Sequence, residues 1–433
     1  MSTQVQVQIR ASTWARESHG LFDYETKMQT RANLHATETS LILRRGNEVY
    51  LAPANRAEEE VREGVKLLAV LLVRPEAVLL VNDLPGRRTP RGRLDRMWVV
   101  VSSLRGNGLN GYRLAEGDVL RLGRICFRIK ELICSSEEAV ESHKLIQGRS
   151  ISLGGLGPGR AKSPPPETPI VLTIADDMET KDGEKVAEVA CKICLMDGFT
   201  EENPMITPCT CKGTMRFIHL ECLQRWLNSK ITTRERGNSR SYSWKALECS
   251  LCKTPFPSTV VIKGISFDLV SIPKPEGEYI TLEAVQHQPD LPQTIHLIPL
   301  QNKNNVRLGR GHDSDVRISD ISVSRNHALI RYDQGRLFLE DNESKFGTLV
   351  QVKRPIALDA DSNFSIQCGR TVLAFTCRQR TSCFACFGCG HSEPEEVLSL
   401  EQIESLEAVS SEEERNFTDE SLPEDEEENP PPS

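Results

Sequence analysis

The sequence predicts a multidomain protein in which all-β regions flank a small α+β module stabilised by metal ions. Residues 36–134 and 278–378 alternate short runs of Val, Leu and Ile with Gly, Asn and Pro, the pattern of short strands separated by turns. Between these regions, seven cysteines and one histidine form four close pairs within residues 191–252. A length of 433 residues suits two to four domains of this kind.

The other segments have few residues that could build a core. Residues 135–185 contain Gly-rich and Pro-rich runs, and residues 259–277 contain Pro273 and Pro275 as breakers. The expected order of parts is a flexible N-terminus (1–35), a β-rich domain (36–134), a linker (135–185), the metal module (186–258), a second linker (259–277), a β-sandwich (278–378), a Cys-rich segment (379–391) and a disordered acidic tail (392–433).

Charge is distributed unevenly along the chain. The 53 basic and 61 acidic residues give a formal net charge of −8. Residues 392–433 hold 16 acidic residues and one basic residue, so this tail carries −15 and the preceding 391 residues carry +7. A net charge of +7 over that length is too dilute to indicate nucleic-acid binding, so no nucleic-acid partner is expected.

The sequence does not predict membrane spanning or secretion. Its longest apolar run, Leu67–Val73, has seven residues, whereas a membrane-spanning helix needs about 20. The first residues form no apolar signal core, and Ser2 replaces the glycine that N-myristoylation requires. We therefore expect a cytoplasmic or nuclear protein with reduced cysteines, which favours thiolates on metal over disulfides.

The paired cysteines have the spacing of zinc ligands. A pair separated by one or two residues can occupy two corners of a tetrahedron, and a second pair from elsewhere completes it. Eight ligands suffice for two zinc ions, each held entirely by protein, so the sites are expected to be structural. The ligand pairs are Cys191 with Cys194, Cys209 with Cys211, His219 with Cys222, and Cys249 with Cys252.

The second and third pairs resemble those of the RING-CH, or RING-variant, finger of ubiquitin ligases. PHD-type histone readers use the same ligand order, but their second pair usually has a wider gap than Cys209-Thr210-Cys211. The segments Ile206–Thr214 and His219–Leu227 also look like the RING-CH family. The resemblance implies a cross-brace, in which Cys191, Cys194, His219 and Cys222 hold one ion and Cys209, Cys211, Cys249 and Cys252 hold the other.

The same resemblance implies partners and a reaction. In the family, a groove docks a ubiquitin-conjugating enzyme, and the matching residues here are Ile193, Trp226 on a helix over 220–230, and Pro255. Lys253 is a further candidate, for contact with ubiquitin. Such a finger is a ubiquitin protein transferase that positions a charged conjugating enzyme without a covalent intermediate. The alternatives are that Trp226 only packs the core and that Lys253 is solvated surface.

Residues 306–376 carry a second set of motifs, Leu308-Gly309-Arg310, Ser324-Arg325-Asn326-His327 and Ser344–Thr348. This set resembles the forkhead-associated (FHA) domain, an all-β sandwich that binds phosphothreonine peptides. The resemblance implies that Arg310, Ser324 and Arg325 lie at the phosphopeptide and that His327 is structural. Guanidinium and hydroxyl groups are suitable donors to a phosphate dianion.

Two observations complicate this assignment. Phe346 stands where the family usually has the Asn that holds the peptide backbone, which puts affinity and selectivity in question. In the N-terminal region, Arg105–Gly111 and Leu114–Gly123 look like the last third of an FHA domain without a phosphate site. A degenerate FHA-like domain and an unrelated β domain are both compatible with that region.

The C-terminal segments leave more than one reading open. Cys383, Cys386, Cys389 and His391 could bind a third metal ion, the cysteines could be acylated and give peripheral membrane association, or neither could hold. The acidic tail could be phosphorylated and mask the FHA loops, or serve only as a disordered solubilising segment.

Together these motifs predict a RING-type E3 ubiquitin ligase. Its FHA domain would recruit phosphothreonine-containing partners. The alternatives are a non-catalytic zinc-finger and FHA scaffold, or a reader of phospho-signals on chromatin.

Overall fold

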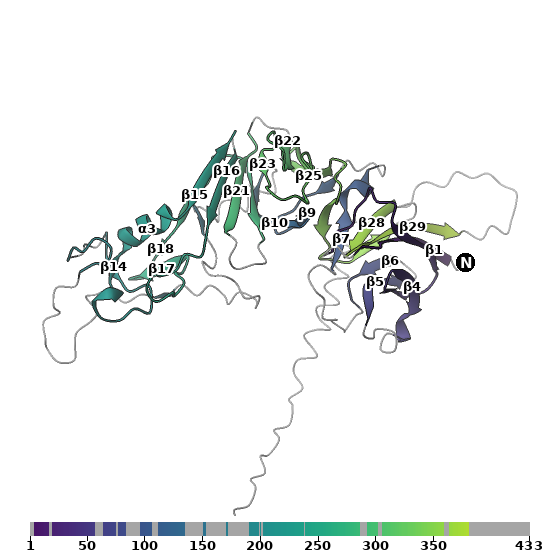
Figure 1. The fold of residues 1–433 in the computed structure, drawn as a ribbon, viewed down its shortest axis with the longest axis horizontal. Helices are drawn as coiled ribbons and strands as arrows, with labels where there is room; N and C mark the ends of the chain where they lie inside the picture. The colour runs from purple at the N-terminus through teal and green to yellow at the C-terminus, as the bar shows by residue number, and fades with distance from the viewer. Residues whose placement is uncertain are drawn as a thin grey trace, which may run out of the picture. The chain divides into compact units, whose positions relative to one another are not determined.

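Strands dominate the computed structural model, and α3 (Leu220–Ser229) is the one α-helix among the described residues (Figure 1). The same residues include the short 3-10 helices η1 (Ala54–Arg56), η3 (Val101–Leu104) and η5 (Gly213–Arg216). Among the residues that the structure describes, no helix is long and apolar enough to cross a bilayer. The structure describes residues 4–16, 20–56, 64–74, 77–83, 96–105, 111–134, 150–152, 170–171, 190–198, 200, 202–237, 239–285, 292–301, 305–358 and 363–380.

One five-stranded sheet carries the FHA-like motifs. Its strand order is β23-β22-β24-β25-β8. Along β25, buried residues alternate with exposed or half-buried ones, so one face of the sheet packs on a core. The strands are β22 (Asn305–Gly309), β23 (Val316–Arg317), β24 (Ala328–Asp333), β25 (Arg336–Asp341) and, from the N-terminal region, β8 (Tyr112–Arg113).

A second five-stranded sheet contains the longest apolar run of the sequence. That run forms most of β5, and residues 67–72 are buried on both faces of the sheet. The order is β27-β6-β5-β3-β4. The strands are β3 (Ser40–Arg45), β4 (Glu48–Pro53), β5 (Val65–Val73), β6 (Val78–Val81) and, from the C-terminal region, β27 (Ile356–Leu358).

A third sheet has twelve strands, in the order β15-β16-β21-β20-β10-β9-β26-β7-β28-β29-β1-β2. In Figure 1, the yellow-green strands β28 and β29 lie beside the purple strand β1. The strands are β1 (Gln4–Trp14), β2 (Gln29–Ala36), β7 (Met97–Val100), β9 (Val119–Leu122), β10 (Ile125–Ile133), β15 (Thr232–Arg236), β16 (Ser239–Trp244), β20 (Tyr279–Ala284), β21 (Gln293–Pro299), β26 (Thr348–Gln351), β28 (Asn363–Cys368) and β29 (Thr371–Arg380).

Two hydrophobic cores lie between these sheets, and each combines residues from the N-terminal and C-terminal halves of the chain. Phe127 and Leu120 share one core with Ile330. Ile9 and Phe375 share the other. The β-rich stretches 36–134 and 278–378 therefore contribute to common cores. The structure is mostly β, as the sequence predicts, while a degenerate FHA domain at the N-terminus stays a prediction.

Three segments expected to lack regular structure contain strands. Residues 1–35 hold β1 and most of β2, because Val7, Ile9 and Ala11 place apolar side chains at alternate positions that become buried. Residues 259–277 hold β17 (Thr259–Ile262), β18 (Ile265–Asp268) and β19 (Ser271–Pro273). Residues 135–185, expected to form a linker, hold β11 (Ser150–Ser152) and β12 (Ile170–Val171), which pair with β19 and β17.

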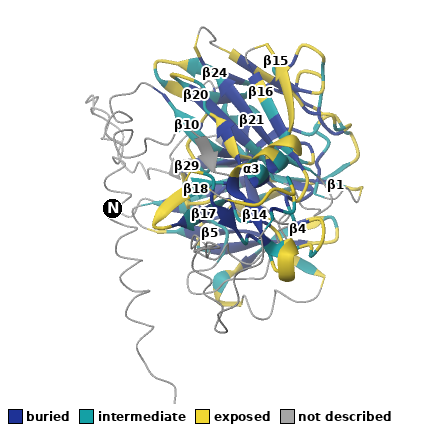
Figure 2. Ribbon diagram, turned by 90° about the vertical axis from the view of Figure 1, so that its left-hand side faces the viewer, coloured by how far each residue is buried: buried dark blue, intermediate teal, exposed yellow. Residues whose placement is uncertain are grey.

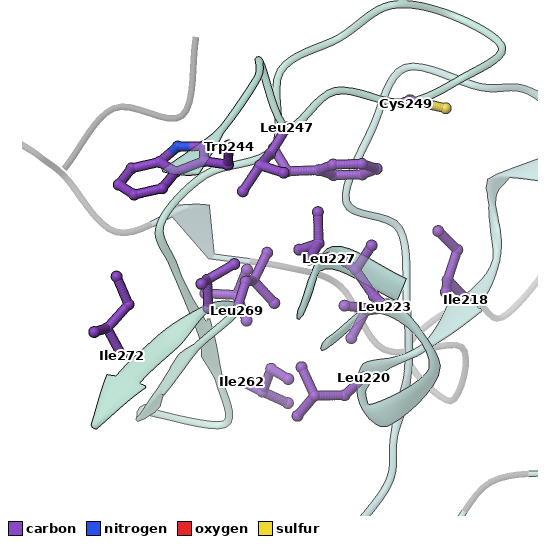
Figure 3. Close-up of a cluster of buried hydrophobic side chains, with 14 of the residues drawn as sticks. Ile218, Leu220, Leu223, Leu227, Trp244, Leu247, Cys249, Ile262, Leu269 and Ile272 are labelled. Atoms are coloured by element: carbon purple, nitrogen blue, oxygen red, sulfur yellow. The ribbon is translucent and has the colours of Figure 1, made fainter. Parts of the chain in front are cut away.

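The metal module is built around α3. Its apolar residues Leu220, Leu223 and Leu227 recur at helical spacing and are buried. Figure 3 shows these side chains facing Ile262 and Leu269, within one buried cluster. The helix is preceded by the short pair β13 (Met205–Ile206) and β14 (Ile218–His219).

The long stretch after α3 forms a hairpin. Its strand β15 is exposed throughout and lies at the sheet edge, where charged residues oppose further strand pairing. Its strand β16 pairs with β21, with Ser241 opposite His296. Figure 2 shows this contrast between exposed β15 and the more buried β21.

Candidate metal centres and anion-binding loops

The first cluster of ligand atoms comes from Cys191, Cys194, His219 and Cys222. These atoms all lie within 4.8 Å of one another. The first two belong to a tight turn in which the Leu195 N–H donates to the Cys191 carbonyl oxygen at 2.8 Å. His219 ends β14, and Cys222 lies in the first turn of α3.

His219 is oriented as a metal ligand. Its Nδ1 lies 3.3 Å from Sγ of Cys194, and its Nε2 donates to the carbonyl oxygen of Gly198 at 2.6 Å. Metal-binding histidines commonly hold their other ring nitrogen in this way, which fixes the tautomer and the ring orientation. Nδ1 is therefore the atom that faces the cluster.

The second cluster comes from Cys209, Cys211, Cys249 and Cys252, whose sulfur atoms also lie within 4.8 Å of one another. Its last pair repeats the turn of the first cluster. The Lys253 N–H donates to the Cys249 carbonyl oxygen at 2.9 Å, and Lys253 has the same left-handed φ as Leu195, 60° against 61°. The two turns thus have one geometry.

The donor sets suit zinc. Three thiolates with one imidazole, and four thiolates, are both common tetrahedral zinc sets. Backbone N–H groups of Ile193 and His219 each lie 3.4 Å from Sγ of Cys191, which favours a thiolate. The two clusters could hold two zinc ions. Each cluster combines alternate ligand pairs, which is the cross-brace arrangement that the resemblance implies.

Lys192 is a residue that sequence analysis missed. Its ammonium lies 3.5 Å from Sγ of both Cys209 and Cys249. Burial opposes the charged ammonium, but the neighbouring sulfurs outweigh it and raise the pKa of Lys192. The lysine lies within the first ligand pair yet contacts the second cluster. It can therefore offset part of the negative charge of four thiolates.

The four candidate docking residues occupy the surface of this module. Ile193 is 39% exposed between the first ligands, and Pro255 is exposed after the last. Trp226 is half-buried, with its ring 6.1 Å from that of Phe256. The Lys253 ammonium is 3.4 Å from a carboxylate oxygen of Glu248. Four further apolar residues of this module are exposed and were not expected from the sequence: Leu195, Met196, Met215 and Leu251.

The anion-binding candidates lie in two loops that are hydrogen-bonded to each other. Arg310 follows β22, and its N–H donates to the carbonyl oxygen of Ser324 at 2.9 Å. The N–H of Gly311 donates in the same way to Arg325 at 2.9 Å. Both arginines are exposed, while Ser324 is half-buried. The structure thus brings Arg310, Ser324 and Arg325 together.

A cavity of about 920 Å³ lies beside these loops. Arg310, Arg317 and Arg325 line it together with Asp313 and Asp320. Arg317 belongs to β23, and sequence analysis did not select it. Three guanidinium groups against two carboxylates make the cavity suitable for an anionic ligand.

Phe346 is held by aromatic and charged neighbours from the N-terminal region. Its ring centroid lies 6.5 Å from that of Trp14. The adjacent Lys345 accepts a backbone hydrogen bond from Tyr24 at 3.0 Å, and its ammonium is 3.5 Å from a carboxylate oxygen of Asp23. The loop that usually offers an Asn side chain therefore presents an aromatic ring here.

Two domain families match the chain. The RING-variant domain matches residues 191–252, and the FHA domain matches residues 306–366. The chain therefore contains a RING-variant domain and an FHA domain, and both resemblances drawn from the sequence are confirmed.

The curated relatives of the chain include several MARCH-type E3 ubiquitin ligases. E3 ubiquitin-protein ligase MARCHF7 of Mus musculus is 34% identical over 97 residues, which cover 22% of this chain and 13% of the relative. Probable E3 ubiquitin-protein ligase MARCHF10 of Homo sapiens is 37% identical over 179 residues, 40% of this chain and 18% of the relative. The chain thus spans less than a fifth of the length of these relatives.

Proposed function

We propose that this protein is an E3 ubiquitin ligase whose RING-variant domain binds a ubiquitin-conjugating enzyme. The observation that carries the proposal is the pair of interleaved ligand clusters, within a segment that matches the RING-variant domain. Both clusters are filled by protein ligands, so neither offers an open metal position for hydrolysis. The reaction would rest on holding the enzyme–ubiquitin thioester in a reactive pose.

Exposed apolar side chains support a docking surface on this domain. Ile193 and Leu251 each lie between the two ligands of a tight turn, and both are exposed. Trp226 presents a partly exposed ring beside Phe256. Large apolar anchors of this kind dominate the energetics of protein interfaces. We propose Ile193, Trp226 and Pro255 as the contacts to the conjugating enzyme and Lys253 as a contact to ubiquitin.

A ubiquitination assay with zinc-loaded protein and a panel of conjugating enzymes tests this function. Ile193→Ala and Trp226→Ala are each expected to lower the rate at least about tenfold, the effect of losing an interface anchor. Ile265→Ala is the matched control, because Ile265 is 61% exposed on β18, outside the docking set. A parent protein that forms no ubiquitin chains with any enzyme would favour the non-catalytic scaffold instead.

We propose that the FHA domain recruits phosphothreonine-containing partners to the ligase. Support comes from the three guanidinium groups that line the cavity beside Ser324. A phosphate dianion can accept charge-assisted hydrogen bonds from such groups. Arg310, Ser324 and Arg325 are the proposed contacts, with Arg317 as a further cation.

Binding of a phosphothreonine peptide and its unphosphorylated form tests this recruitment. Arg310→Ala and Ser324→Ala are expected to weaken binding of the phosphorylated form. Arg336→Ala should leave it unchanged, because Arg336 is exposed on β25 and does not line the cavity. Equal affinity of the parent for both peptides would exclude phosphate recognition and leave the ligase proposal standing.

We propose a cytoplasmic or nuclear location. The candidate acylation sites Cys383, Cys386 and Cys389 lie outside the described residues. Fractionation of the parent and of a variant with all three changed to serine tests peripheral membrane association. A membrane fraction that disappears in the variant would indicate acylation.

A further inference from the structure

Each five-stranded sheet contains four strands from one β-rich stretch and one edge strand from the other. In one sheet, β8 pairs with β25, with Arg113 opposite Phe338. In the other, β27 pairs with β6, with Ala357 opposite Leu79. Both added strands are antiparallel and occupy the corresponding edge of sheets with matching strand order, β23-β22-β24-β25 and β4-β3-β5-β6. The sheets differ at the opposite edge, where β23 is parallel to β22 but β4 is antiparallel to β3.

The twelve-stranded sheet shows the same reciprocity. Strands β7 and β26 pair at its centre, with Val99 opposite Val350. On one side, β9 and β10 join β26 to β20. On the other side, β28 and β29 join β7 to β1. Along the chain, β8, β9 and β10 follow β7, whereas β27, β28 and β29 follow β26. The strands β8, β9 and β10 therefore pair with β25, β26 and β20 of the C-terminal stretch. Reciprocally, β27, β28 and β29 pair with β6, β7 and β1 of the N-terminal stretch.

The two sets also share a turn. Leu122-Gly123-Arg124 connects β9 to β10, and Cys368-Gly369-Arg370 connects β28 to β29. Both glycines have a φ of +57°. Equivalent strands, edges and turns indicate two copies of one sandwich.

We propose that the chain folds as two β-sandwiches that have exchanged their last three strands. The phosphopeptide-binding sandwich then consists of β20–β26 together with β8, β9 and β10 from the N-terminal region. Exchange of equivalent elements is known between identical protomers and occurs in multidomain and repeat proteins. It follows that residues 112–133 belong to the recruiting domain itself.

The exchanged turn contacts the anion-binding loop. The N–H of Arg124 donates to Oγ of Ser322 at 2.9 Å, and its guanidinium lies 3.6 Å from a carboxylate oxygen of Asp320. Asp320 lines the cavity, and Ser322 is buried two residues before Ser324. A Cβ on Gly123 would meet the carbonyl oxygen of Ser322 at 2.5 Å. Gly123 and Arg124 are therefore positioning residues for the loop, a role that rests on the proposed phosphopeptide binding.

Cysteine cross-linking in the full zinc-loaded chain tests the exchange without reference to binding. The variant carries four substitutions, Arg113→Cys, Phe338→Cys, Leu79→Cys and Ala357→Cys, and its disulfides are mapped by mass spectrometry after mild oxidation. Exchange predicts intramolecular links 113–338 and 79–357, since paired strands place Cα atoms within disulfide range. Links 113–79 and 338–357 would indicate two unexchanged sandwiches. That result, a covalent dimer, or no link overturns the proposal.

Phosphopeptide affinity tests the positioning role. Gly123→Ala is expected to weaken binding at least about fivefold, because the loop must move away from the new methyl group. Gly46→Ala is the matched control: Gly46 has φ +60°, but a Cβ there would meet nothing within 4 Å. Arg124→Ala should weaken binding about two- to fivefold, and Arg124→Lys should restore most of it.

The outcomes separate the two proposals. Equal affinities for Gly123→Ala and Gly46→Ala would overturn the positioning role. A parent protein that binds no phosphopeptide would overturn the proposed recruitment, whereas the cross-links would still decide the exchange.

Discussion

Ser324 and His327 are joined by a hydrogen bond in which the Ser324 backbone N–H donates to Nδ1 of His327 at 3.0 Å. The other ring nitrogen, Nε2, lies 3.1 Å from the carbonyl oxygen of Gly347 and donates to it. Burial lowers the pKa of His327, which keeps the ring in this neutral form. The imidazole therefore connects the loop of Ser324 to the loop of Gly347.

Replacing His327 with Ala should weaken phosphopeptide binding and stability together. The substitution leaves the Ser324 N–H and the Gly347 carbonyl without their partner, and each unsatisfied buried group costs about 1–3 kcal/mol. His327→Asn should be milder, since its amide oxygen can accept from Ser324. Peptide affinity and chemical denaturation measure both effects.

His35→Ala is the control for that substitution, because His35 is an exposed histidine on β2. It should change neither peptide affinity nor stability. A His327→Ala protein with the affinity of the parent would show that the two loops keep their positions without the imidazole.

Stability should fall as the pH drops from about 6.5 towards 4. Burial lowers the pKa of His296 to about 4 from its usual 6.5, so the unfolded state binds more protons in this range. Because the unfolded state gains the proton first, acid favours unfolding. The free energy of unfolding should fall by about 1 kcal/mol between pH 7.5 and 5.5. Denaturation midpoints of the parent and of His296→Gln measure the difference.

In the parent, Oγ of Ser241 lies 2.8 Å from Nδ1 of His296. His296→Gln keeps a polar side chain opposite this hydroxyl. Its stability should therefore depend less on pH over the same range, whereas zinc release would affect both proteins alike. Parallel pH profiles for the two proteins would contradict the assigned role of His296.

Removal of zinc should unfold the RING-variant domain. Of the ligands in the first cluster, His219 directly precedes α3 and Cys222 lies in its first turn, so the position of the helix depends on the ion held there. We expect two zinc ions per chain by elemental analysis. Cys191→Ser and Cys249→Ser should each lose one ion. A third ion in the parent would instead point to Cys383–His391, outside the described residues.

The sequence predicted local chemistry better than long-range strand pairing. The four ligand pairs are close in sequence, so the eight ligands could be identified from spacing alone. The loops at Arg310 and Ser324 were likewise visible as short motifs. In contrast, the pairing of β8 with β25 joins residues more than 200 positions apart, and no local pattern specifies it. Lys192 was missed because its charge acts on a cluster distant in sequence.

The RING-variant and FHA domains are joined through the β15–β16 hairpin. Strand β16 pairs with β21, and Ser243 Oγ lies 3.0 Å from Oγ1 of Thr294 across this junction. The Arg236 guanidinium donates to the carbonyl oxygen of His312, a residue that lines the anion-binding cavity. The hairpin thus connects the zinc-binding segment to the loops of the proposed phosphopeptide site.

Breaking this junction should separate recruitment from transfer. Ser243 lies in β16, which pairs with β15 on one side and β21 on the other. In Ser243→Pro, the missing N–H therefore removes a ladder hydrogen bond whichever neighbouring strand the nitrogen faces. Ubiquitination of a phosphothreonine-bearing substrate should fall several-fold, because the two sites lose their fixed spacing, while discharge of the conjugating enzyme to free lysine should persist. Thr233→Pro, in the edge strand β15, is the control and should have the smaller effect. Equal loss of both activities in Ser243→Pro would mean that the RING-variant domain itself had unfolded, and unchanged substrate ubiquitination would show that the junction does not set the spacing.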